Sequence, residues 1–343
     1  MNINKTEIDK ILLIKPRGIG DIVLSTIVLD NLSSHFPAAE IHYLVEKFAK
    51  QSVEDNPLIK KIHTMQKTEF AYFVARRIKK EKYDLIIDMW SNPRSAQITF
   101  LSGARYRLGY SYRGRRYAYN IKANAGRGDV HSAEHNLELL KAIDVPVTSK
   151  KVHYHINRNS QENADRFFKE SNLFNKTIIG IIPSGGWESK RCDAEKFTEI
   201  CRKLIYRFDV ALLLLWGPGD EGDVKKIKRD LKDGIVVSPE TDVDEMAALI
   251  NNCDVIIAND SGPMHIAAAL DVPTLGLFGP TDPKNHGPYN TNSDYIIKDD
   301  LHCIICNKLT CPYDHECMKE LPVDEVLQKV EKLGRKFLRV KSY

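Results

Sequence analysis

Three glycine-containing segments carry the residues whose types and spacing could do chemistry, and a fourth, the proline-bracketed loop Leu277–Pro283, is expected at the same cleft. The first, Lys15–Asp21, reads Lys-Pro-Arg-Gly-Ile-Gly-Asp, and its glycines allow a tight bend and a close approach of the backbone to a ligand. Asp21 stands at the expected start of a helix, where its carboxylate could cap the helix and face a cleft; a capped helix without chemistry is the alternative. The segment is not a P-loop, because no Gly-Lys-Ser/Thr closes it.

The other two segments have the composition of anion-binding turns. In Pro183–Arg191, small residues expose backbone N–H groups and the last two residues are cations, a combination that suits phosphates. A solvated loop with two surface cations is the alternative. In Asn259–His265, Pro263 fits the first position of a helix whose N-terminal N–H groups would bind an anion. Asp260 and His265 would flank that site, although a lone histidine on such a helix is more often structural.

The segments follow short apolar runs that alternate with helical patterns along the whole chain. Such alternation predicts parallel sheets with helices on both faces, in which ligands bind at the carboxyl ends of the strands. About five strands precede a polar break at residues 148–161, and five or six follow it. We therefore predict two doubly wound, Rossmann-like domains facing a central cleft. The first helix is expected over Ile22–Phe36 and the last, strongly basic toward its end, over Val323–Val340.

Composition limits the class of protein. The 343 residues carry 50 basic and 46 acidic side chains, so no global field requires a nucleic-acid partner. The longest apolar run, Val210–Trp216, is too short to span a membrane, and Met1–Lys10 lacks an apolar signal-peptide core. A cytoplasmic protein is therefore expected. Seven cysteines in such a chain favour free, buried or metal-binding thiols over a disulfide framework.

Four longer stretches resemble the ADP-heptose:lipopolysaccharide heptosyltransferases of glycosyltransferase family 9. They are residues 15–26 (KPRGIGDIVLST), 84–110, 187–197 (WESKRCDAEKF) and 259–283 (NDSGPMHIAAALDVPTLGLFGPTDP). The resemblance implies a GT-B fold with an acceptor-binding domain at 1–157 and a nucleotide-sugar-binding domain at 158–322. A C-terminal helix at 323–343 is expected to pack back toward the N-terminal domain.

The resemblance also implies an activity. The family moves L-glycero-D-manno-heptose from ADP-heptose to the inner core of lipopolysaccharide, with inversion at the anomeric carbon and without a metal or other cofactor. Asp21 matches the proposed general base, which takes the proton of the acceptor hydroxyl. Lys190 matches the basic residue that contacts the donor phosphates.

The remaining implied site residues divide into two sets. The donor set comprises Ser184, Gly185, Lys190, Asp260, Ser261, Gly262, Met264 and His265, and the acceptor set comprises Gly18, Gly20, Arg105, Arg113, Arg115 and Arg116. The arginines would meet an anionic glycolipid acceptor. The basic tail Lys332–Lys341 could add attraction to an anionic leaflet, which predicts peripheral association with the inner face of the inner membrane.

Alternatives remain open. A member of the same family could use another nucleotide sugar or acceptor. The Tyr/Arg-rich segment 101–130 could mark a nucleic-acid-binding protein, and the Gly-x-Gly-x-x-Gly segment at 217–222 an NAD oxidoreductase. Asp220 and Glu221 would place negative charge where a pyrophosphate would bind, so we interpret 217–222 as a tight turn with an acidic helix start.

Two groups of residues raise the question of a metal. Asp242 and Asp244 resemble the metal-binding pair of other glycosyltransferases, but a helix start is the preferred interpretation and no metal is assigned. Four cysteines near the C-terminus follow a C-x2-C-x4-C-x5-C spacing. Their thiols could be buried or pack a loop, bind a structural metal, or include an oxidised pair. They are Cys303, Cys306, Cys311 and Cys317.

Overall fold

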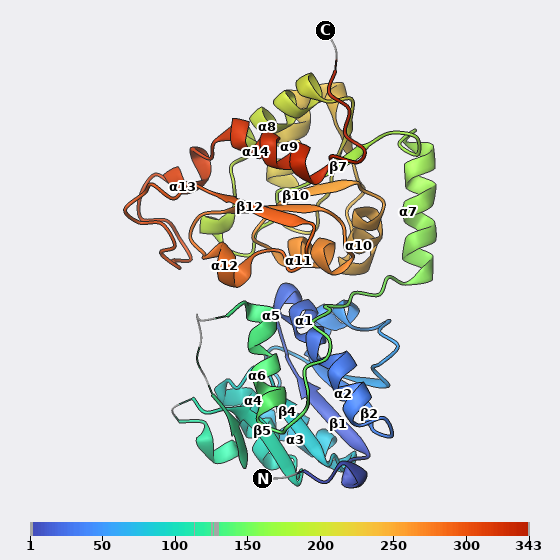
Figure 1. Cartoon of the computed structure of the whole chain (residues 1–343), viewed down its shortest axis with the longest axis vertical. Coiled ribbons are helices and arrows are strands. Elements are labelled where there is room, and N and C mark those ends of the chain that lie inside the picture. The colour runs from blue at the N-terminus through green and yellow to red at the C-terminus, as the bar shows by residue number, and fades with distance from the viewer. Residues whose placement is uncertain (1–2, 113, 125, 127–129, 342–343) are drawn as a thin grey trace. The chain divides into compact units, whose positions relative to one another are not determined.

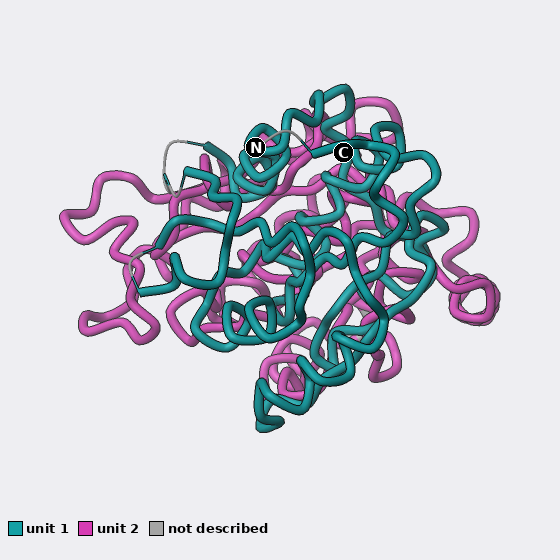
Figure 2. The backbone as a smooth tube through the Cα atoms, turned by 90° about the horizontal axis from the view of Figure 1, so that it is seen from below, with its two compact units in different colours: residues 1–155 teal, residues 156–343 magenta. Residues whose placement is uncertain are grey.

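The chain forms two compact units, Met1–His155 and Ile156–Tyr343, in a computed structural model (Figures 1 and 2). The structure describes residues 3–112, 114–124, 126 and 130–341, so Arg113, one of the predicted acceptor arginines, lies outside the described residues. The division falls two residues before the expected 157/158 boundary. Among the helices of the described ranges, none has both the length and the apolar content to cross a membrane.

Unit 1 is built on a six-stranded parallel sheet with strand order β3-β2-β1-β4-β5-β6. Its strands are β1 (Lys10–Ile14), β2 (Glu40–Glu46), β3 (Lys61–Met65), β4 (Leu85–Asp88), β5 (Tyr106–Tyr110) and β6 (Ile121–Ala123). Its helices are α1 (Ile19–Ser25), α2 (Leu29–His35), α3 (Ala71–Lys80), α4 (Pro93–Leu101), α5 (Ser132–His135) and α6 (Leu137–Lys141). The inward side chains of α3 and α4 pack with those of β1, β2 and β4 in one buried cluster.

Unit 2 repeats the architecture with strand order β12-β11-β10-β7-β8-β9. Its strands are β7 (Ile178–Ile182), β8 (Ala211–Leu214), β9 (Val236–Val237), β10 (Val255–Asn259), β11 (Thr274–Phe278) and β12 (Ser293–Ile297). Its helices are α7 (Arg158–Glu170), α8 (Ala194–Arg207), α9 (Glu221–Leu231), α10 (Val243–Asn251), α11 (Gly262–Ala269), α12 (Pro283–His286), α13 (Glu316–Lys319) and α14 (Val323–Leu333). Short 3₁₀ segments in the two units are η1 (Lys5–Glu7), η2 (Thr26–Val28), η3 (Lys47–Ser52), η4 (Arg116–Ala118), η5 (Glu188–Lys190) and η6 (Lys232–Gly234).

All strand pairs within the two sheets are parallel, so every strand of a sheet ends at the same edge, which we call the carboxyl edge. The central strands are buried along their whole length, as expected for parallel sheets covered on both faces. The segments that follow β1, β7, β10 and β11 therefore lie at the carboxyl edges of their units. These are the segments in which the sequence predicts the site.

The first helical region differs from the single helix expected over Ile22–Phe36. It is divided into α1, η2 and α2, and α1 begins three residues earlier, at Ile19. The hydroxyl groups of Ser25 and Thr26 donate to the carbonyl oxygens of Ile22 and Val23, at 2.6 and 2.7 Å. Such side-chain bonds to the preceding turn compete with the helical pattern and explain the division.

The last helix is shorter than the expected Val323–Val340. It ends at Leu333 with Gly334 as its C-cap. Val326 and Val330 lie in the hydrophobic core of unit 2, together with side chains of α8 and the sheet. The apolar side chains, spaced at the 3.6-residue period of a helix, all face that core. The expected packing of residues 323–343 toward the N-terminal domain stays a prediction.

Candidate active site

Asp21 lies in the first turn of α1, directly after β1. We expected it to be the helix cap, but Gly18 is the N-cap and Asp21 is the third helical residue. Its side chain is exposed, and Oδ1 lies 3.7 Å from Nζ of Lys15. An accessible carboxylate with a cation beside it at the carboxyl edge is available to an external hydroxyl group.

Gly18 is the residue that permits this geometry. Its φ of +82° lies in the left-handed region, and a Cβ atom built on it would be 2.4 Å from Oδ2 of Asp21. Only glycine satisfies both conditions, so the first predicted glycine has a defined structural task. Gly20, by contrast, is a buried residue inside α1.

Two cavities of about 320 and 270 Å³ adjoin this turn in unit 1. Both include Arg17, Glu46 and Lys67 among their lining residues, and the smaller one also includes Arg94. The buried carboxylate of Glu46 accepts a hydrogen bond from Nη2 of Arg17 at 2.7 Å and lies 3.7 Å from Nη1 of Arg94. The two arginines are thereby fixed at the carboxyl edge, where they favour an anionic ligand.

Asp88 organises the neighbouring loop and was not predicted. It is fully buried at the end of β4, accepts hydrogen bonds from the backbone N–H groups of Trp90 and Ser91, and accepts another from the Tyr119 hydroxyl at 2.7 Å. Burial raises the pKa of its carboxyl group, and these hydrogen bonds oppose that rise. Asp88 therefore shapes the turn that leads into α4 and the cavities.

The structure separates the predicted acceptor arginines. Arg115 and Arg116 follow β5 at the carboxyl edge, and Nε of Arg116 donates to the carbonyl of Ser111 at 3.2 Å. Arg105 precedes β5, at the opposite edge of the sheet, where it pairs with Glu7. The parallel strand therefore carries Arg105 to the edge of the sheet opposite to Asp21, and its acceptor role, which the resemblance implies, stays a prediction.

In unit 2, Lys190 and Asp260 form the centre of the predicted donor site. Nζ of Lys190 lies 2.6 Å from Oδ2 of Asp260 and 4.3 Å from the ring centroid of Trp187. The same Oδ2 accepts a hydrogen bond from the hydroxyl of Thr281 at 2.6 Å. Three segments of the sequence, after β7, β10 and β11, thus meet around one carboxylate.

The helix α11 begins at the same place. Gly262 is its first residue, and the predicted donor residues Met264 and His265 are buried in its first turns. Ser261 is the N-cap, yet its buried hydroxyl has no hydrogen-bond partner within the part of the chain that the structure describes. The first N–H groups of a helix and a hydroxyl beside a lysine form a site suited to a phosphate group.

The turn after β7 differs from its expected role in one respect. We expected Arg191 to add charge for a ligand, but its Nη2 lies 2.5 Å from Asp220 and 3.1 Å from Asp223. The hydroxyl of Ser184 also donates to Asp220, at 2.5 Å. Gly185 has no room for a side chain, because a Cβ atom would lie 2.7 Å from Cγ of Arg191. This cluster holds the turn, and Lys190 remains beside the helix N-terminus.

The cysteine-containing loop, residues 303–317, is hydrogen-bonded to η5. The backbone N–H and the hydroxyl of Ser189 donate to the carbonyls of Leu309 and Lys308, at 3.2 and 2.6 Å. A ring nitrogen of His315 lies 2.8 Å from the carbonyl of Ser189. The loop therefore contacts the residue next to Lys190. All seven cysteines of the chain are free thiols.

Metal-binding side chains gather elsewhere. Among the described residues, the one group of three potential ligands with atoms within 4.8 Å of one another is His42, His63 and Glu81, in unit 1. Both imidazoles are hydrogen-bonded to the hydroxyl of Tyr83 at 2.7 Å, and Glu81 pairs with Lys61 at 2.6 Å. The hydrogen bonds and the ion pair already account for this cluster. Asp242 caps α10, as predicted.

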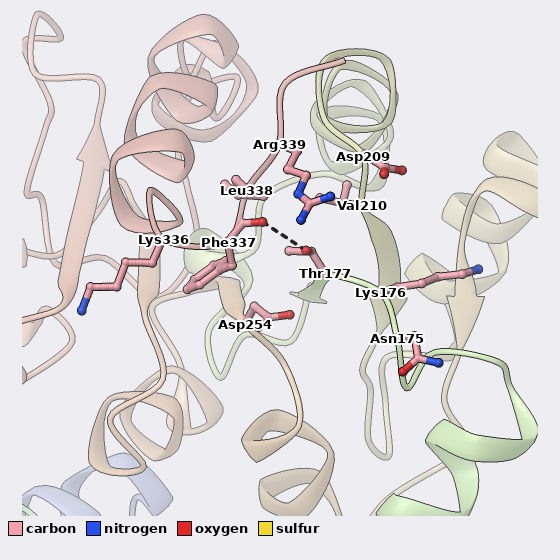
Figure 3. A pocket seen from close by; sticks show the side chains of 10 residues that line it. All are labelled: Asn175, Lys176, Thr177, Asp209, Val210, Asp254, Lys336, Phe337, Leu338 and Arg339. Atoms are coloured by element: carbon pink, nitrogen blue, oxygen red, sulfur yellow. Dashed lines mark hydrogen bonds between the residues drawn. The ribbon is translucent and has the colours of Figure 1, made fainter. Parts of the chain in front are cut away.

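Unit 2 also contains a cavity of about 780 Å³ (Figure 3). Thr177, Val210 and Asp254, which line it, immediately precede β7, β8 and β10. The cavity is therefore at the edge opposite to Lys190. The C-terminal segment 336–339 forms its other wall, and Thr177 donates to the carbonyl of Phe337 at 3.3 Å.

The two Rossmann-like parallel sheets, each with polar turns at its carboxyl edge, define an α/β protein of the GT-B glycosyltransferase fold. Residues 72–316 match glycosyltransferase family 9 (heptosyltransferase). The chain therefore belongs to this family and is a glycosyltransferase.

Similar proteins support the assignment over most of the chain. A "Lipopolysaccharide heptosyltransferase 1" of Campylobacter coli is 24% identical over 94% of this chain and 98% of its own length. A "Putative glycosyltransferase" of Haemophilus influenzae is 25% identical over 84% of this chain and 88% of its own length. Among solved structures, a family 9 glycosyltransferase from Veillonella parvula has a TM-score of 0.85 at 23% identity, covering 96% of this chain and 99% of that one. ADP-heptose lps heptosyltransferase II of E. coli has a TM-score of 0.78 at 20% identity, covering 95% and 99%.

Proposed function

We propose that this protein is an inverting, metal-independent heptosyltransferase. It would move heptose from ADP-L-glycero-D-manno-heptose to the inner core of lipopolysaccharide, with Asp21 as the general base. The names of the relatives described above support a heptosyl donor and a lipopolysaccharide acceptor. The observation that carries the donor half of the proposal is the pair of Lys190 and Asp260 at the N-terminus of α11.

The donor diphosphate would bind at that helix. Backbone N–H groups of α11 and the hydroxyl of Ser261 would contact phosphate oxygens, and Lys190 would offset the charge that develops on the departing ADP. Asp260 keeps the ammonium group of Lys190 beside the helix in the absence of a ligand. No divalent cation is required in this scheme, because a lysine and a helix dipole supply the positive potential.

The acceptor would bind in unit 1. Its hydroxyl oxygen would attack the anomeric carbon from the face opposite to the phosphate, the bond from that carbon to the ADP oxygen would break, and Asp21 would take the hydroxyl proton. Arg17 and Arg94 line the adjoining cavities, and with Arg115 and Arg116 they suit the anionic groups of a glycolipid. An acceptor of this kind also supports peripheral membrane association.

Thermal stabilisation by ADP, UDP, GDP and NAD, with and without magnesium and a chelator, tests the donor. A ligand at about 100 times its dissociation constant adds about 2.7 kcal/mol to the free energy of unfolding, which is measurable as a rise in the midpoint. Selective stabilisation by ADP that chelator leaves unchanged is expected, followed by transfer from ADP-heptose. A response to UDP or GDP alone would replace the donor, and a response to NAD alone would overturn the proposal.

A further inference from the structure

An unusual number of large apolar side chains point to solvent around α3 and α4. Phe70 is 75% exposed, Tyr72 60% and Phe73 54%. Their rings contact one another, with centroid distances of 6.5 Å between Phe70 and Phe73 and 5.6 Å between Tyr72 and Phe73. A protein surface rarely leaves clustered aromatic rings exposed without a binding partner.

The hydrophobic core does not need these rings. Ala71, Val74, Ala75 and Ile78 form the inward face of α3 and fill the cluster against the sheet. With 3.6 residues per turn, the intervening positions must point outward. On α3 these outward side chains are two aromatic rings and four cations, and they are Tyr72, Phe73, Arg76, Arg77, Lys79 and Lys80.

The neighbouring helix extends the surface. Helix α4 packs beside α3 in unit 1 (Figure 1), and Phe100 and Leu101 at its end are exposed. The ring of Phe100 contacts the exposed ring of Tyr117 in η4, with 5.5 Å between centroids. Neither helix contains an aspartate or a glutamate. We call this surface the aromatic–basic face; it comprises Phe70, Tyr72, Phe73, Arg76, Arg77, Lys79, Lys80, Phe100, Leu101 and Tyr117.

The aromatic–basic face continues into the acceptor cavities. Gln66 and Lys67, just before α3, line the larger cavity with Arg17 and Gly18. Asn92 and Arg94, at the start of α4, line the smaller one. A surface that held α3 and α4 would therefore bring these cavities close to it.

We propose that the aromatic–basic face docks on a phospholipid bilayer with anionic headgroups. Aromatic rings insert at the level of the headgroups and the cations attract the negative surface potential, which is the combination that interfacial helices use. The cations of α3 provide the charge complementarity, and the acidic residues Glu69 and Glu81 lie only at its two ends, where Glu69 pairs with Arg77. The orientation of a lipid-anchored acceptor toward the cavities rests on the proposed function, whereas binding to the bilayer does not.

Co-sedimentation with vesicles tests the docking. The full-length protein is mixed with vesicles of phosphatidylcholine alone or with about one-third phosphatidylglycerol, at low and at physiological salt. We expect binding to the anionic vesicles that weakens with salt. The variant Phe70→Ser/Tyr72→Ser/Phe73→Ser should bind at least about tenfold more weakly, because it loses the apolar contact. Unchanged binding of this variant, or no binding of the parent protein, would overturn the proposal.

A matched control comes from unit 2. Phe174 and Tyr206 are 68% and 69% exposed, so Phe174→Ser/Tyr206→Ser removes similar surface elsewhere and should bind vesicles like the parent protein. Equal loss in the control would mean that no particular face is used. Light scattering tests whether the aromatic–basic face instead binds a second copy of the chain. If the parent protein is a dimer and the triple variant is a monomer, the face is a dimer interface and bilayer docking is overturned.

Activity separates this inference from the proposed function. The triple variant should transfer to a soluble, lipid-free core oligosaccharide at the parent rate and lose rate only on acceptor embedded in vesicles. If the parent protein binds anionic vesicles but transfers no heptose, the proposed function fails and the docking surface stands.

Discussion

The ammonium group of Lys190 lies 2.6 Å from Oδ2 of Asp260, although 69 positions of the sequence separate the two residues. Thr281 donates to the same oxygen, so the carboxylate has one cationic and one neutral partner. In this arrangement Asp260 positions the lysine, and α11 begins two residues after this carboxylate. The predicted donor residues Lys190 and Asp260 are therefore held together by their own contacts.

Replacing Lys190 with alanine should remove stabilisation by ADP and lower the transfer rate by about 10²-fold, because a preorganised cation no longer meets the leaving phosphate. Thermal shift and initial-rate measurements check both effects. Lys196→Ala is the control, since Lys196 is as little exposed as Lys190 but pairs with Glu199 within α8. ADP binding by Lys190→Ala at the parent affinity would exclude this residue from the donor site.

The variant Asp21→Asn should lose about 10²- to 10⁴-fold in kcat, since the amide cannot accept the proton of the attacking hydroxyl. ADP should stabilise the variant as it does the parent protein, because the donor residues belong to unit 2. Asp144→Asn provides a control at an exposed carboxylate. The backbone φ of Asp144 is +56°, which asparagine adopts readily. Near-normal transfer by Asp21→Asn would remove Asp21 from the mechanism.

Gly18→Ala should disable transfer beyond its effect on stability. The new Cβ would meet Oδ2 of Asp21 at 2.4 Å and displace the carboxylate, in addition to the cost of about 1–2 kcal/mol for a left-handed alanine. Gly103→Ala separates the two effects, because φ is +76° there and the nearest atom is an ordinary 3.5 Å away. Both variants should lower the unfolding midpoint, but only Gly18→Ala should lower kcat. Equal kcat losses would show that strain alone is responsible.

Thiol labelling by iodoacetamide at pH 8 should distinguish the cysteines. Burial raises the pKa of Cys201 to about 12 and also raises the pKa values of Cys192 and Cys253, so these three should resist labelling in the folded protein. Exposed Cys306 should react first. Cys317 should react slowly, because burial and the neighbouring thiols raise its pKa to about 11.

Mass spectrometry of the labelled protein reports each site, and labelling in denaturant gives the expected total of seven. Pretreatment with a chelator tests whether a metal protects the loop. Labelling that chelator leaves unchanged is expected for thiols that only pack the loop, whereas a chelator-dependent gain at Cys303, Cys306 and Cys311 would identify a bound metal.

The sequence predicts the architecture well, because its signals are local. Apolar runs separated by glycine-rich turns identify the central strands, and the two-sheet α/β fold is confirmed. The short edge strand β6, with three residues, and the polar helix α7 were not predicted, since neither carries enough apolar side chains to form a distinct pattern. The sequence placed Arg105 among the acceptor residues by resemblance alone, without considering the end of β5 at which this arginine lies.

Contacts between distant segments lie beyond reasoning from local pattern. The pairing of Thr281 with Asp260 depends on β11 lying next to β10, which follows from strand order alone. The same is true of Glu46, whose carboxylate joins arginines from two other turns, and of Arg191, which turns toward Asp220 and Asp223. The sequence shows which of these side chains are charged, but their hydrogen-bond and ion-pair partners follow only from the fold.

The carboxylates of Asp220 and Asp223 affect the direction in which a charged ligand would bind. Two glycine-containing turns of unit 2, at 217–222 and at 259–263, differ in the charged groups beside them. Aspartates and their arginine occupy the first, whereas the second presents helix N–H groups, a hydroxyl and a lysine. We therefore expect a ligand with one anionic end to place that end at 259–263, because the two carboxylates and the single arginine at 217–223 leave a net negative charge there.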